Sequence, residues 1–489
     1  MPVKDRAKYG IGADRQKVDW DSIPWSSVEN SIRKLRRRIF RATKEQKWNQ
    51  VRSLMKLMLR SYFNVLESVR RATQKNTGRK TAGVDKKLAL TPASRMALVR
   101  RMVKHTLWKV QPARRVYIPK TDGKQRPLGI PTIRDRVAQA MIKNALEPSW
   151  EARFESNSYG FRPGRSAHDA VKHCWLALNG NTSRPWILDA DIKGAFDNIS
   201  HDYIMSAIGL TPGRKLIWQW LKAGYVEREL FHATESGTPQ GGIVSPLLAN
   251  IALDGLQREL GATYRFVRYA DDFIVCGKSR EKIEIAKIKI EDWLLSRGLA
   301  LNPEKTRICH LEKGFNFLGF SFGRFNGKCL FKPEKKKVFA FLRKMRKWLS
   351  DHSGVSAETV IKLFNPILRG WSNYYKHAVS KQVFSYVEHH IWSMLWKWCL
   401  RRHPNKGKHW VRLKYFGRTH EWRFSAKTRM NGETRTISLF DLNSVEIERH
   451  IKVRGTASPD DPKLIEYWRK RAERKTLAPR RLKHLNTRA

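Results

Sequence analysis

The sequence predicts an α+β fold, with a strand-rich central region between two helical regions. Apolar and polar residues alternate over residues 186–192, and two apolar, strand-like runs flank the acidic residues at 271 and 272. Residues 26–71 and those beyond about 335 instead repeat apolar side chains at the spacing of helices. Strands gathered in one region, with helices segregated from them, are typical of the α+β class.

The first helical region, residues 26–71, predicts two basic amphipathic helices. Their apolar faces are formed by Ile32, Leu35 and Ile39 in the first helix and by Val51, Met55, Met58, Tyr62, Val65 and Val69 in the second. The opposite faces carry many arginines and lysines. Such residues usually form a solvated helix face, but the unbalanced charge of this chain favours phosphate contact. A Gly-rich polar break at residues 76–85 marks the end of the region.

The charge of the chain indicates a polyanionic partner. The 97 Lys and Arg residues against 44 Asp and Glu residues give a formal net charge of +53, which favours nucleic acid. A membrane-surface protein is the alternative, but the charge is not gathered in one amphipathic helix. Because the N-terminus lacks an apolar signal core and no apolar run is long enough for a membrane span, we expect no membrane association and a cytoplasmic location. The five scattered cysteines favour neither structural zinc nor disulfides.

The central strands carry the candidate catalytic carboxylates. Alternation places Asp189 and Asp191 on one strand face, and periodicity alone does not choose between them. Asp271 and Asp272 fall at or beside a hairpin turn, where Asp is also common for structural reasons. Unpaired carboxylates on apolar strands are costly, so a bound cation is the natural compensation, and oxygen ligands beside phosphate select Mg²⁺. A two-metal site for nucleotidyl transfer follows as a hypothesis.

Around the tetrapeptide at residues 269–272, Tyr-Ala-Asp-Asp, further blocks follow in a specific order. They are VYIPKTDGKQRPLGIP at 116–131, SYGFRPGRS at 158–166, LDADIKGAFDNI at 188–199, GTPQGGIVSPLLAN at 237–250, LNPEKT at 301–306, FNFLGF at 315–320 and PILRGWSNYY at 366–375. Over nearly its full length the chain resembles a bacterial group II intron reverse transcriptase and maturase. The resemblance implies a right-hand polymerase with fingers, a ferredoxin-like palm and an α-helical thumb, with a helical N-terminal extension and a small basic C-terminal domain.

The resemblance also chooses among the carboxylates. It makes Asp191, not Asp189, a catalytic residue, together with Asp271 and Asp272. The same three residues and Ile192 would be the metal ligands for two Mg²⁺ ions, for which Mn²⁺ is a possible substitute.

Nucleotide-binding roles fall by resemblance on Lys120, Arg126, Phe196, Gln240 and Lys305. Lys120 and Arg126 would clamp the triphosphate, because charge-assisted contacts to phosphate oxygens are strong. Phe196 would crowd a ribose 2′-hydroxyl, Gln240 would contact the new base pair, and Lys305 would contact primer or nucleotide. Surface salt bridges for the two clamp cations and a core position for Phe196 are the alternatives.

The block at residues 366–375 resembles the maturase signature of the thumb, which implies binding to a structured intron RNA. The expected RNA-binding residues are Arg33, Arg36, Arg37, Arg60, Arg369 and Lys376. Aromatic residues interleaved with cations suit base stacking and phosphate contact. Trp371 and Tyr374, however, are three apart on a predicted helix, so core packing explains them at least as well.

The resemblance divides the chain into five expected regions. They are an N-terminal basic helical extension (1–75), fingers (76–185), a palm with the catalytic aspartates (186–332), a helical thumb with the maturase domain (333–416), and a basic segment resembling DNA-binding regions (417–489). Many bacterial members of the family carry a C-terminal His-Asn-His endonuclease with cysteine pairs. Residues 417–489 contain no such pattern, so we expect no endonuclease there.

The expected reaction is RNA-directed DNA synthesis from dNTPs on a DNA primer. The expected partners are a group II intron RNA, the RNA template, the primer and a target DNA, and the expected tasks are splicing and retrohoming in the bacterial cytoplasm. Two alternatives stay open: a related enzyme co-opted for host DNA repair or defence, and a purely RNA-binding splicing factor on a decayed polymerase scaffold. All three aspartates are present, which argues against decay.

Overall fold

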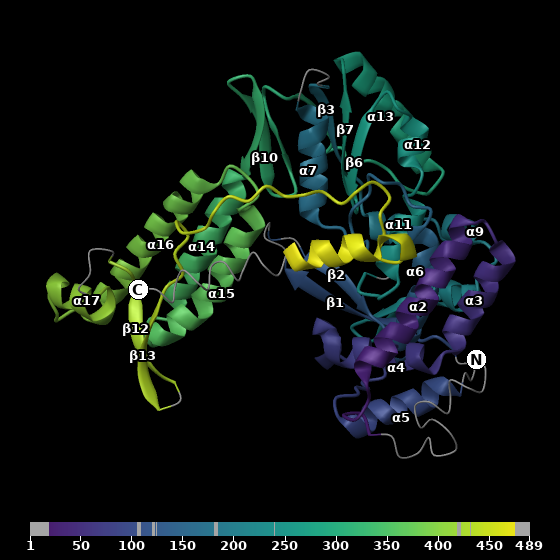
Figure 1. Ribbon diagram of the computed structural model, residues 1–489, viewed down its shortest axis with the longest axis horizontal. Coiled ribbons are helices and arrows are strands. Elements are labelled where there is room, and N and C mark those ends of the chain that lie inside the picture. Colours follow the sequence, from purple (N-terminus) through teal and green to yellow (C-terminus); the bar gives the residue numbers. More distant parts are fainter. Residues whose placement is uncertain are drawn as a thin grey trace.

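The computed structural model describes residues 19–104, 109–119, 123, 125–179, 184–238, 240–417, 422–430 and 432–474. The molecule has the shape of an arch, with N-terminal helices at one end, a palm in the middle and thumb helices at the other end (Figure 1). Among the described residues, no helix combines the length and the apolar character that a membrane crossing requires.

The N-terminal part is helical, as predicted. It comprises α2 (Trp25–Lys44), α3 (Trp48–Arg60), α4 (Tyr62–Arg70), the short helices η1 (Arg71–Lys75) and η2 (Thr77–Lys80), and α5 (Pro92–Val103). Helices α2, α3 and α4 pack against the long helix α6 (Ile133–Glu151).

The second predicted helix is in fact two helices, because the chain is extended at Ser61. At this break the Asn64 side chain donates a hydrogen bond to the Met58 carbonyl at 3.0 Å. The apolar spacing continues across the break, so periodicity alone did not reveal it.

A small sheet joins two strands from the region expected to form the fingers with two strands from within the region expected to form the palm. Its strand order is β2-β1-β4-β5, built from β1 (Ala113–Pro119), β2 (Gln125–Ile130), β4 (Tyr225–Glu227) and β5 (Leu230–His232). Strands β1 and β2 form an antiparallel hairpin, and Ile118 pairs with Arg126.

The palm is a four-stranded antiparallel sheet of order β6-β7-β3-β8. Its strands are β3 (Trp186–Asp191), β6 (Arg265–Tyr269), β7 (Asp272–Gly277) and β8 (Arg307–His310). From the β8 edge inward, the neighbouring strands are the fourth, first, third and second palm strands in the sequence. This is the ferredoxin-like strand order. The helices between β3 and β6 are α8 (Ala195–Asn198), α9 (His201–Ile208), α10 (Arg214–Lys222), α11 (Ser245–Ala252) and α12 (Leu256–Leu260).

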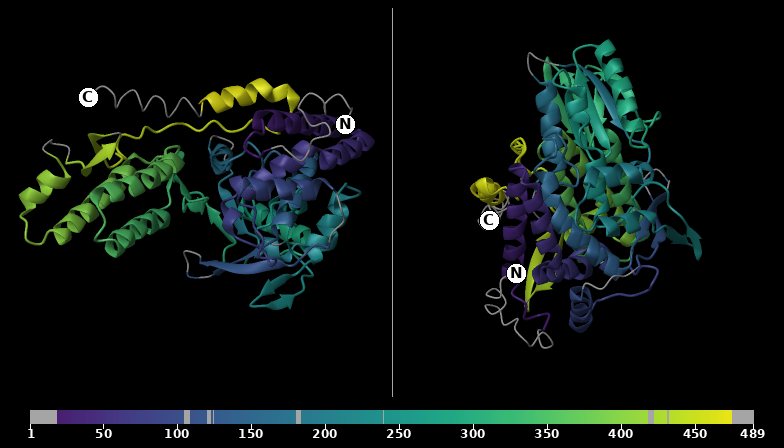
Figure 2. Two further views of the ribbon diagram at one scale, coloured as in Figure 1. Left: turned by 90° about the horizontal axis from the view of Figure 1, so that it is seen from below. Right: turned by 90° about the vertical axis from the view of Figure 1, so that its right-hand side faces the viewer.

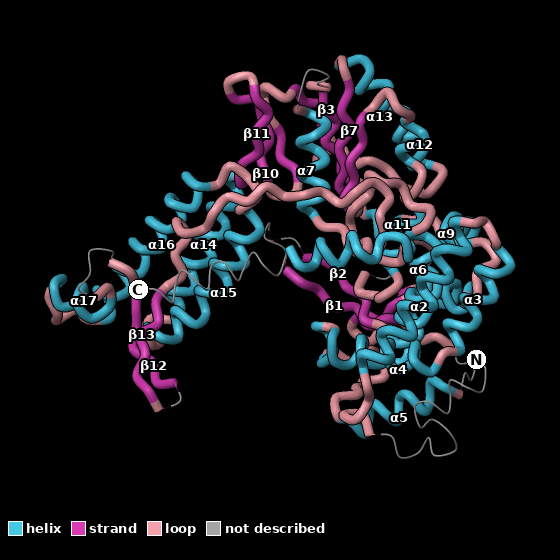
Figure 3. The backbone as a smooth tube through the Cα atoms, viewed as in Figure 1, coloured by secondary structure: helices cyan, strands magenta, loops and turns pink. Residues whose placement is uncertain are grey.

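Helices cover both faces of the palm sheet (Figure 3). On one face, Leu188 and Val275 share a core with residues of α13 (Arg280–Leu295). On the other, Ile187 and Ile274 share a second core with α7 (Ala167–Leu178) and the thumb. Since alternate residues of β3 point to alternate faces, Asp189 and Asp191 lie on the α7 side.

A three-stranded sheet leads from the palm to the thumb. It consists of β9 (Phe315–Phe317), β10 (Phe320–Phe325) and β11 (Lys328–Pro333) in the order β11-β10-β9. The thumb contains α14 (Lys335–Asp351), α15 (Ala357–Tyr375), α16 (Lys381–Arg402) and α17 (Lys408–Tyr415), which confirms the helical prediction beyond residue 335. The hairpin of β12 (Ser425–Met430) and β13 (Glu433–Ser438) packs on α15.

Residues 439–474, here called the C-terminal segment, return from the thumb across the palm to helix α2 (Figure 2). The segment includes η3 (Pro462–Leu464) and a helix over residues 465–474. Just before η3, Asp460 accepts two hydrogen bonds from Arg36 of α2. The segment therefore connects regions that lie far apart in the sequence.

Candidate active site

Asp191 and Asp272 face one another across two palm strands. Asp191 is the last residue of β3 and Asp272 is the first residue of β7, and the two are direct partners in the antiparallel register. Asp189 pairs instead with Ile274 in β7 and accepts a hydrogen bond from Arg307 at 3.1 Å. The register therefore separates the two carboxylates that alternation alone could not distinguish.

Asp271 lies in the tight turn that joins β6 to β7. Tyr269 pairs with Asp272, so Ala270 and Asp271 form a two-residue turn. This confirms the prediction of a hairpin at the acidic pair. Ala270 has a φ of 60°, a left-handed conformation that costs energy in any residue with a side chain and that persists only where its surroundings hold it.

The block at residues 158–166 contacts the backbone of this turn. Tyr159 donates its backbone N–H to the carbonyl of Arg268 at 2.9 Å, and Arg268 donates its own N–H to Asn157 at 2.9 Å. Gly160 lies so close that a Cβ atom added there would be 2.3 Å from the Ala270 nitrogen. Only glycine fits at this approach.

A buried arginine also holds the turn. Arg268 is 1% exposed, and its guanidinium donates to the Ala270 carbonyl at 3.1 Å and to Asn250 at 3.2 Å. Asn250 in turn donates to the Gly160 carbonyl at 2.8 Å. Sequence reasoning missed Arg268 as a functional residue, although an arginine in the middle of an apolar strand was a visible signal.

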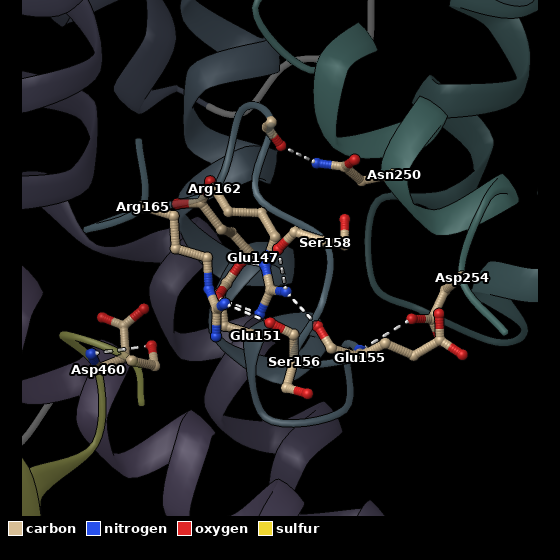
Figure 4. A network of polar contacts seen from close by, with 12 residues as sticks. Glu147, Glu151, Glu155, Ser156, Ser158, Arg162, Arg165, Asn250, Asp254 and Asp460 are labelled. Atoms are coloured by element: carbon tan, nitrogen blue, oxygen red, sulfur yellow. Dashed lines mark hydrogen bonds and ion pairs between the residues drawn. The ribbon is translucent and has the colours of Figure 1, made fainter. Parts of the chain in front are cut away.

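A second buried arginine fixes the conformation of the 158–166 block (Figure 4). Arg162 forms a bidentate ion pair with Glu151 of α6 at 3.0 Å and donates to the carbonyls of Glu155 and Ser158. Both side chains of the ion pair are almost fully buried. Removing one partner of such a pair costs about 3–5 kcal/mol, so the block is a rigid support.

The carboxylates at the turn hold protons more tightly than ordinary aspartates do. Asp272 keeps contact with solvent, but partial withdrawal from water, the charge of Asp271 and a hydrogen bond with Asp191 raise the pKa of its carboxyl to about 7. Withdrawal from water also raises the pKa of Asp271. Crowded carboxylates of this kind gain from a nearby cation.

A lysine supplies a positive charge at this position. Lys305 donates to Asp191 Oδ2 at 2.8 Å, and this hydrogen bond raises the pKa of the Lys305 ammonium. Asn302, which sequence reasoning did not single out, donates its backbone N–H to the Asp191 carbonyl at 2.8 Å and its side-chain amide to Asp191 Oδ2 at 3.3 Å. Lys305 thus lies at the carboxylates, and its expected contact with primer or nucleotide stays a prediction.

The donor set at the turn suits a hard divalent cation, because carboxylate oxygens are the ligands that Mg²⁺ prefers. Among the described residues, however, no three His, Cys, Asp or Glu side chains already form a metal cage. In the free protein the positive charge beside Asp191 is the Lys305 ammonium. Ile192 is buried and its bridge partner is Leu301, so only its backbone carbonyl could serve as a ligand.

A second group of expected residues lies together on the fingers side. Arg126 donates to Gln240 Oε1 at 3.1 Å, and Gln240 donates to Asp197 at 3.2 Å. The positive charge of Arg126 also reaches Asp271, whose pKa it lowers in opposition to the withdrawal from water. Asp197, which follows Phe196 directly, is a further residue that sequence reasoning did not single out.

Phe196 is mostly buried, but it lies at the same place. Its carbonyl accepts a hydrogen bond from the Thr238 N–H at 2.6 Å, which joins the block at 188–199 to the block at 237–250. Its ring meets that of Phe161 edge to face at 6.0 Å. Lys120, the remaining expected nucleotide-binding residue, lies outside the described residues.

Two of the expected RNA-binding residues have acidic partners within the folded chain. Arg36 bonds Asp460 and Glu147 at 2.6 and 2.9 Å with little exposure to solvent, so its charge is already neutralised inside the protein. Lys376 is likewise paired with Glu448 at 2.7 Å. The basic composition did not reveal Asp460 and Glu448 as partners, because these residues of the C-terminal segment are distant in sequence from Arg36 and Lys376.

The side chains of the other four expected RNA-binding residues are more exposed to solvent. Arg33, Arg60 and Arg369 are exposed, and Arg37 is partly exposed. By contrast, the aromatic side chains of the maturase-like block pack inward. Trp371 stacks on Phe341 with ring centroids 4.9 Å apart, and the Tyr374 hydroxyl donates to the Leu318 carbonyl at 2.8 Å.

Three family descriptions match the chain. Residues 118–322 match the reverse transcriptase (RNA-dependent DNA polymerase) domain, residues 20–102 the N-terminal domain of reverse transcriptase, and residues 338–416 the maturase-specific domain of group II introns. The candidate carboxylates lie inside the first match.

Similar proteins include bacterial and eukaryotic sequences. Protein YkfC of Escherichia coli is 35% identical over 301 residues, covering 52% of this chain and 79% of YkfC. The group II intron-encoded protein LtrA of Lactococcus lactis is 31% identical over 376 residues, covering 56% of this chain and 62% of LtrA. Maturase-like protein 1 of Euglena gracilis is 26% identical over 367 residues, covering 73% of this chain and 78% of that protein.

The fold assignment rests on the family match and on the strand order of the palm. Members of the reverse transcriptase family use divalent metal ions, and the two kinds of domain imply RNA and DNA as partners. The chain belongs to the group II intron reverse transcriptases, RNA-directed DNA polymerases that also carry a maturase domain.

Proposed function

We propose that Asp191, Asp271 and Asp272 form the catalytic centre for RNA-templated DNA synthesis. The supporting observation is the register that sets Asp191 opposite Asp272, with Asp271 in the adjoining turn. The three carboxylates, with the backbone carbonyl of Ile192, would hold two Mg²⁺ ions, and Mn²⁺ would substitute. Bound there, the ions would activate the primer 3′-hydroxyl and stabilise the departing pyrophosphate.

The neighbouring side chains would bind and orient the nucleotide. Arg126 exchanges its hydrogen bond to Gln240 for a charge-assisted contact with the triphosphate, and Lys120 provides a second such contact. Gln240 is then free to contact the new base pair. Lys305 moves from Asp191 to the nucleotide or primer when cations take its place. Phe196, held by its backbone contact to Thr238, limits the space beside the ribose and so favours dNTPs.

The same chain would act on its own intron RNA. We assign residues 1–75 to the N-terminal extension, 76–185 to the fingers, 186–332 to the palm, 333–416 to the thumb and maturase domain, and 417–489 to a basic segment that contacts target DNA. Arg33, Arg37, Arg60 and Arg369 are available for phosphate contact. The partners are the group II intron RNA, an RNA template, a DNA primer and target DNA, and the tasks are splicing and retrohoming in the bacterial cytoplasm.

Primer extension on an RNA template tests the assigned centre. The intact chain, Asp271→Asn and Asp272→Asn are compared with dNTPs and Mg²⁺, each after a thermal melt to verify folding. We expect both variants to lose synthesis by at least about 100-fold, since electrostatic stabilisation of the reacting atoms is lost. Equal extension by all three proteins would refute the assignment.

A splicing assay at low Mg²⁺ with the cognate intron separates the second task from the first. The Asp variants should still promote splicing, because RNA binding does not use these carboxylates. Loss of splicing by variants that keep a normal melting temperature would contradict a separate maturase role.

A further inference from the structure

A cavity of about 300 Å³ lies away from the catalytic carboxylates, where four parts of the chain meet. Its walls come from α7, from β11, from the loop after α15 and from the C-terminal segment. In Figure 1 the C-terminal segment passes over the junction of α7 with the β9–β11 sheet. The hydrogen bond of His450 to Asp169 of α7, at 3.0 Å, fixes this crossing.

Aromatic and imidazole rings form much of the wall. His168 meets His377 edge to face with ring centroids 4.7 Å apart, and His450 is 5.6 Å from His168. Trp175 and Phe331 add two larger rings. Flat rings around a cavity of this size suit a planar, aromatic ligand.

Two cations flank the same cavity. The Lys172 ammonium lies 3.6 Å from the centroid of the Trp175 ring, and Arg449 is exposed at the cavity wall. Within the described chain, neither cation has a carboxylate within ion-pair distance, and the cavity lining contains no Asp or Glu. Burial and the nearby charge of Arg449 lower the pKa of Lys172. Lys172 and Arg449, which lack carboxylate partners within the described chain, would bind an anionic group of the ligand.

Each of the three histidine rings is held by a hydrogen bond. One nitrogen of each ring is already engaged: His168 donates to the Tyr374 carbonyl at 2.7 Å, His377 donates to the Glu448 carbonyl at 2.7 Å, and His450 bonds Asp169. No metal-binding group of three such side chains is found among the described residues. These hydrogen bonds hold the rings in place and keep the cavity open.

We propose that this cavity binds one unstacked nucleotide of single-stranded RNA, with the base among the rings and the phosphate on Lys172 and Arg449. Single-stranded RNA is recognised by splayed bases that stack on aromatic side chains beside cations. RNA is favoured over other anions with an aromatic ring because residues 377–379 belong to the matched maturase-specific region. The inference thus rests on the proposed maturase function, although at a site separate from the polymerase centre.

Photocrosslinking of the full chain tests this site directly. The probe is a short, unstructured oligoribonucleotide with a single 4-thiouridine, irradiated in complex with the protein and followed by mass spectrometry of the cross-linked peptides. We expect cross-links in peptides that contain Trp175, Phe331 or residues 447–450. Cross-links only at other peptides would overturn the proposal.

Two variants and a matched control sharpen the test. Val379→Trp, at a half-exposed position of the lining, should fill the cavity and reduce these cross-links by about tenfold, the effect expected for loss of one stacked base. Lys172→Glu should reduce them similarly. Lys328→Glu, an equal charge change at an exposed position of β11, should leave them unchanged. Persistence of the cross-links in Val379→Trp, or an equal loss in Lys328→Glu, would contradict a specific pocket.

A DNA oligonucleotide of the same sequence with 4-thiothymidine provides the last comparison. We expect weaker cross-linking to the same peptides, and equal cross-linking would refute the assignment to RNA. Melting temperatures identify any variant that fails to fold. Because the readout is a mapped cross-link, it stays interpretable even if the splicing assay were to fail and the proposed maturase role were wrong.

Discussion

At the active centre, individual carboxylates differ because their neighbours differ. Asp189 and Asp191 are two residues apart on one strand face, yet Arg307 neutralises Asp189 whereas Asp191 faces Asp272. The sequence predicted the shared face but not this difference, because strand register depends on pairing between residues more than 80 positions apart. Only the resemblance to a family selected Asp191 in advance.

The raised pKa of Asp272 predicts a cost in stability at the active centre. Folding raises this pKa from 3.8 to about 7, so between these pH values the folded chain keeps a proton that the unfolded chain has lost. The free energy of unfolding therefore falls as the pH rises from about 4 to about 7. Asp272→Asn removes this penalty.

We accordingly expect Asp272→Asn to melt at a higher temperature than the natural chain at pH 8 without divalent cations, although it should be inactive. The advantage should shrink as the pH is lowered towards 5. Differential scanning fluorimetry in a chelator, over a pH series, measures this. A lower melting temperature, or a difference that does not change with pH, would contradict the raised pKa.

At the scale of elements, the hairpin at residues 266–276 was predictable and its support was not. Apolar strands on either side of two acidic residues predicted a turn, and the structure has one. The contacts that fix the turn come from residues 157–160 and from Asn250. Nothing in the local pattern of those segments indicates their partner, since the contacts form only when helices α6 and α11 pack together.

The close approach of Gly160 to Ala270 predicts that added volume there disturbs the turn. Gly160→Ala would place a Cβ atom 2.3 Å from a backbone nitrogen, so the turn must shift. A displacement of about 1 Å at a reacting centre can cost about 100-fold in rate, so primer extension should fall by a factor of that order.

Gly354→Ala is the matched control, because an added Cβ atom meets nothing within 4 Å there and the backbone is not in the left-handed region. Both variants are assayed for primer extension and melted in parallel. Full activity of a folded Gly160→Ala protein would show that the turn does not depend on this contact.

On the scale of the whole molecule, the C-terminal segment links the thumb, the palm and the N-terminal helices. Its central anchor is Asp169, which accepts hydrogen bonds from the Val453 N–H at 2.8 Å and from Arg471 at 2.9 Å, in addition to its bond with His450. Burial alone would raise the pKa of Asp169, but His450, Ser166 and Val453 together hold it well below its usual range. Composition predicted only a basic tail, since these contacts span about 300 residues of sequence.

Neutralising this anchor should loosen the segment. Asp169→Asn removes the charge that pairs with His450 and Arg471, and loss of one partner from a buried pair costs about 3–5 kcal/mol. We expect faster amide hydrogen exchange over residues 447–474. Glu466→Gln, which removes an exposed ion pair with Arg469 in the same segment, should have little effect. Equal exchange in both variants would show that Asp169 is not the anchor.

The central claim is that Asp191, and not its neighbour Asp189, belongs to the polymerase centre. RNA-templated primer extension by Asp191→Asn and Asp189→Asn compares the same chemical change on one face of one strand. We predict that Asp191→Asn abolishes synthesis while Asp189→Asn retains most of it, with both proteins folded. Retained synthesis in Asp191→Asn, or equal loss in both variants, would contradict the account.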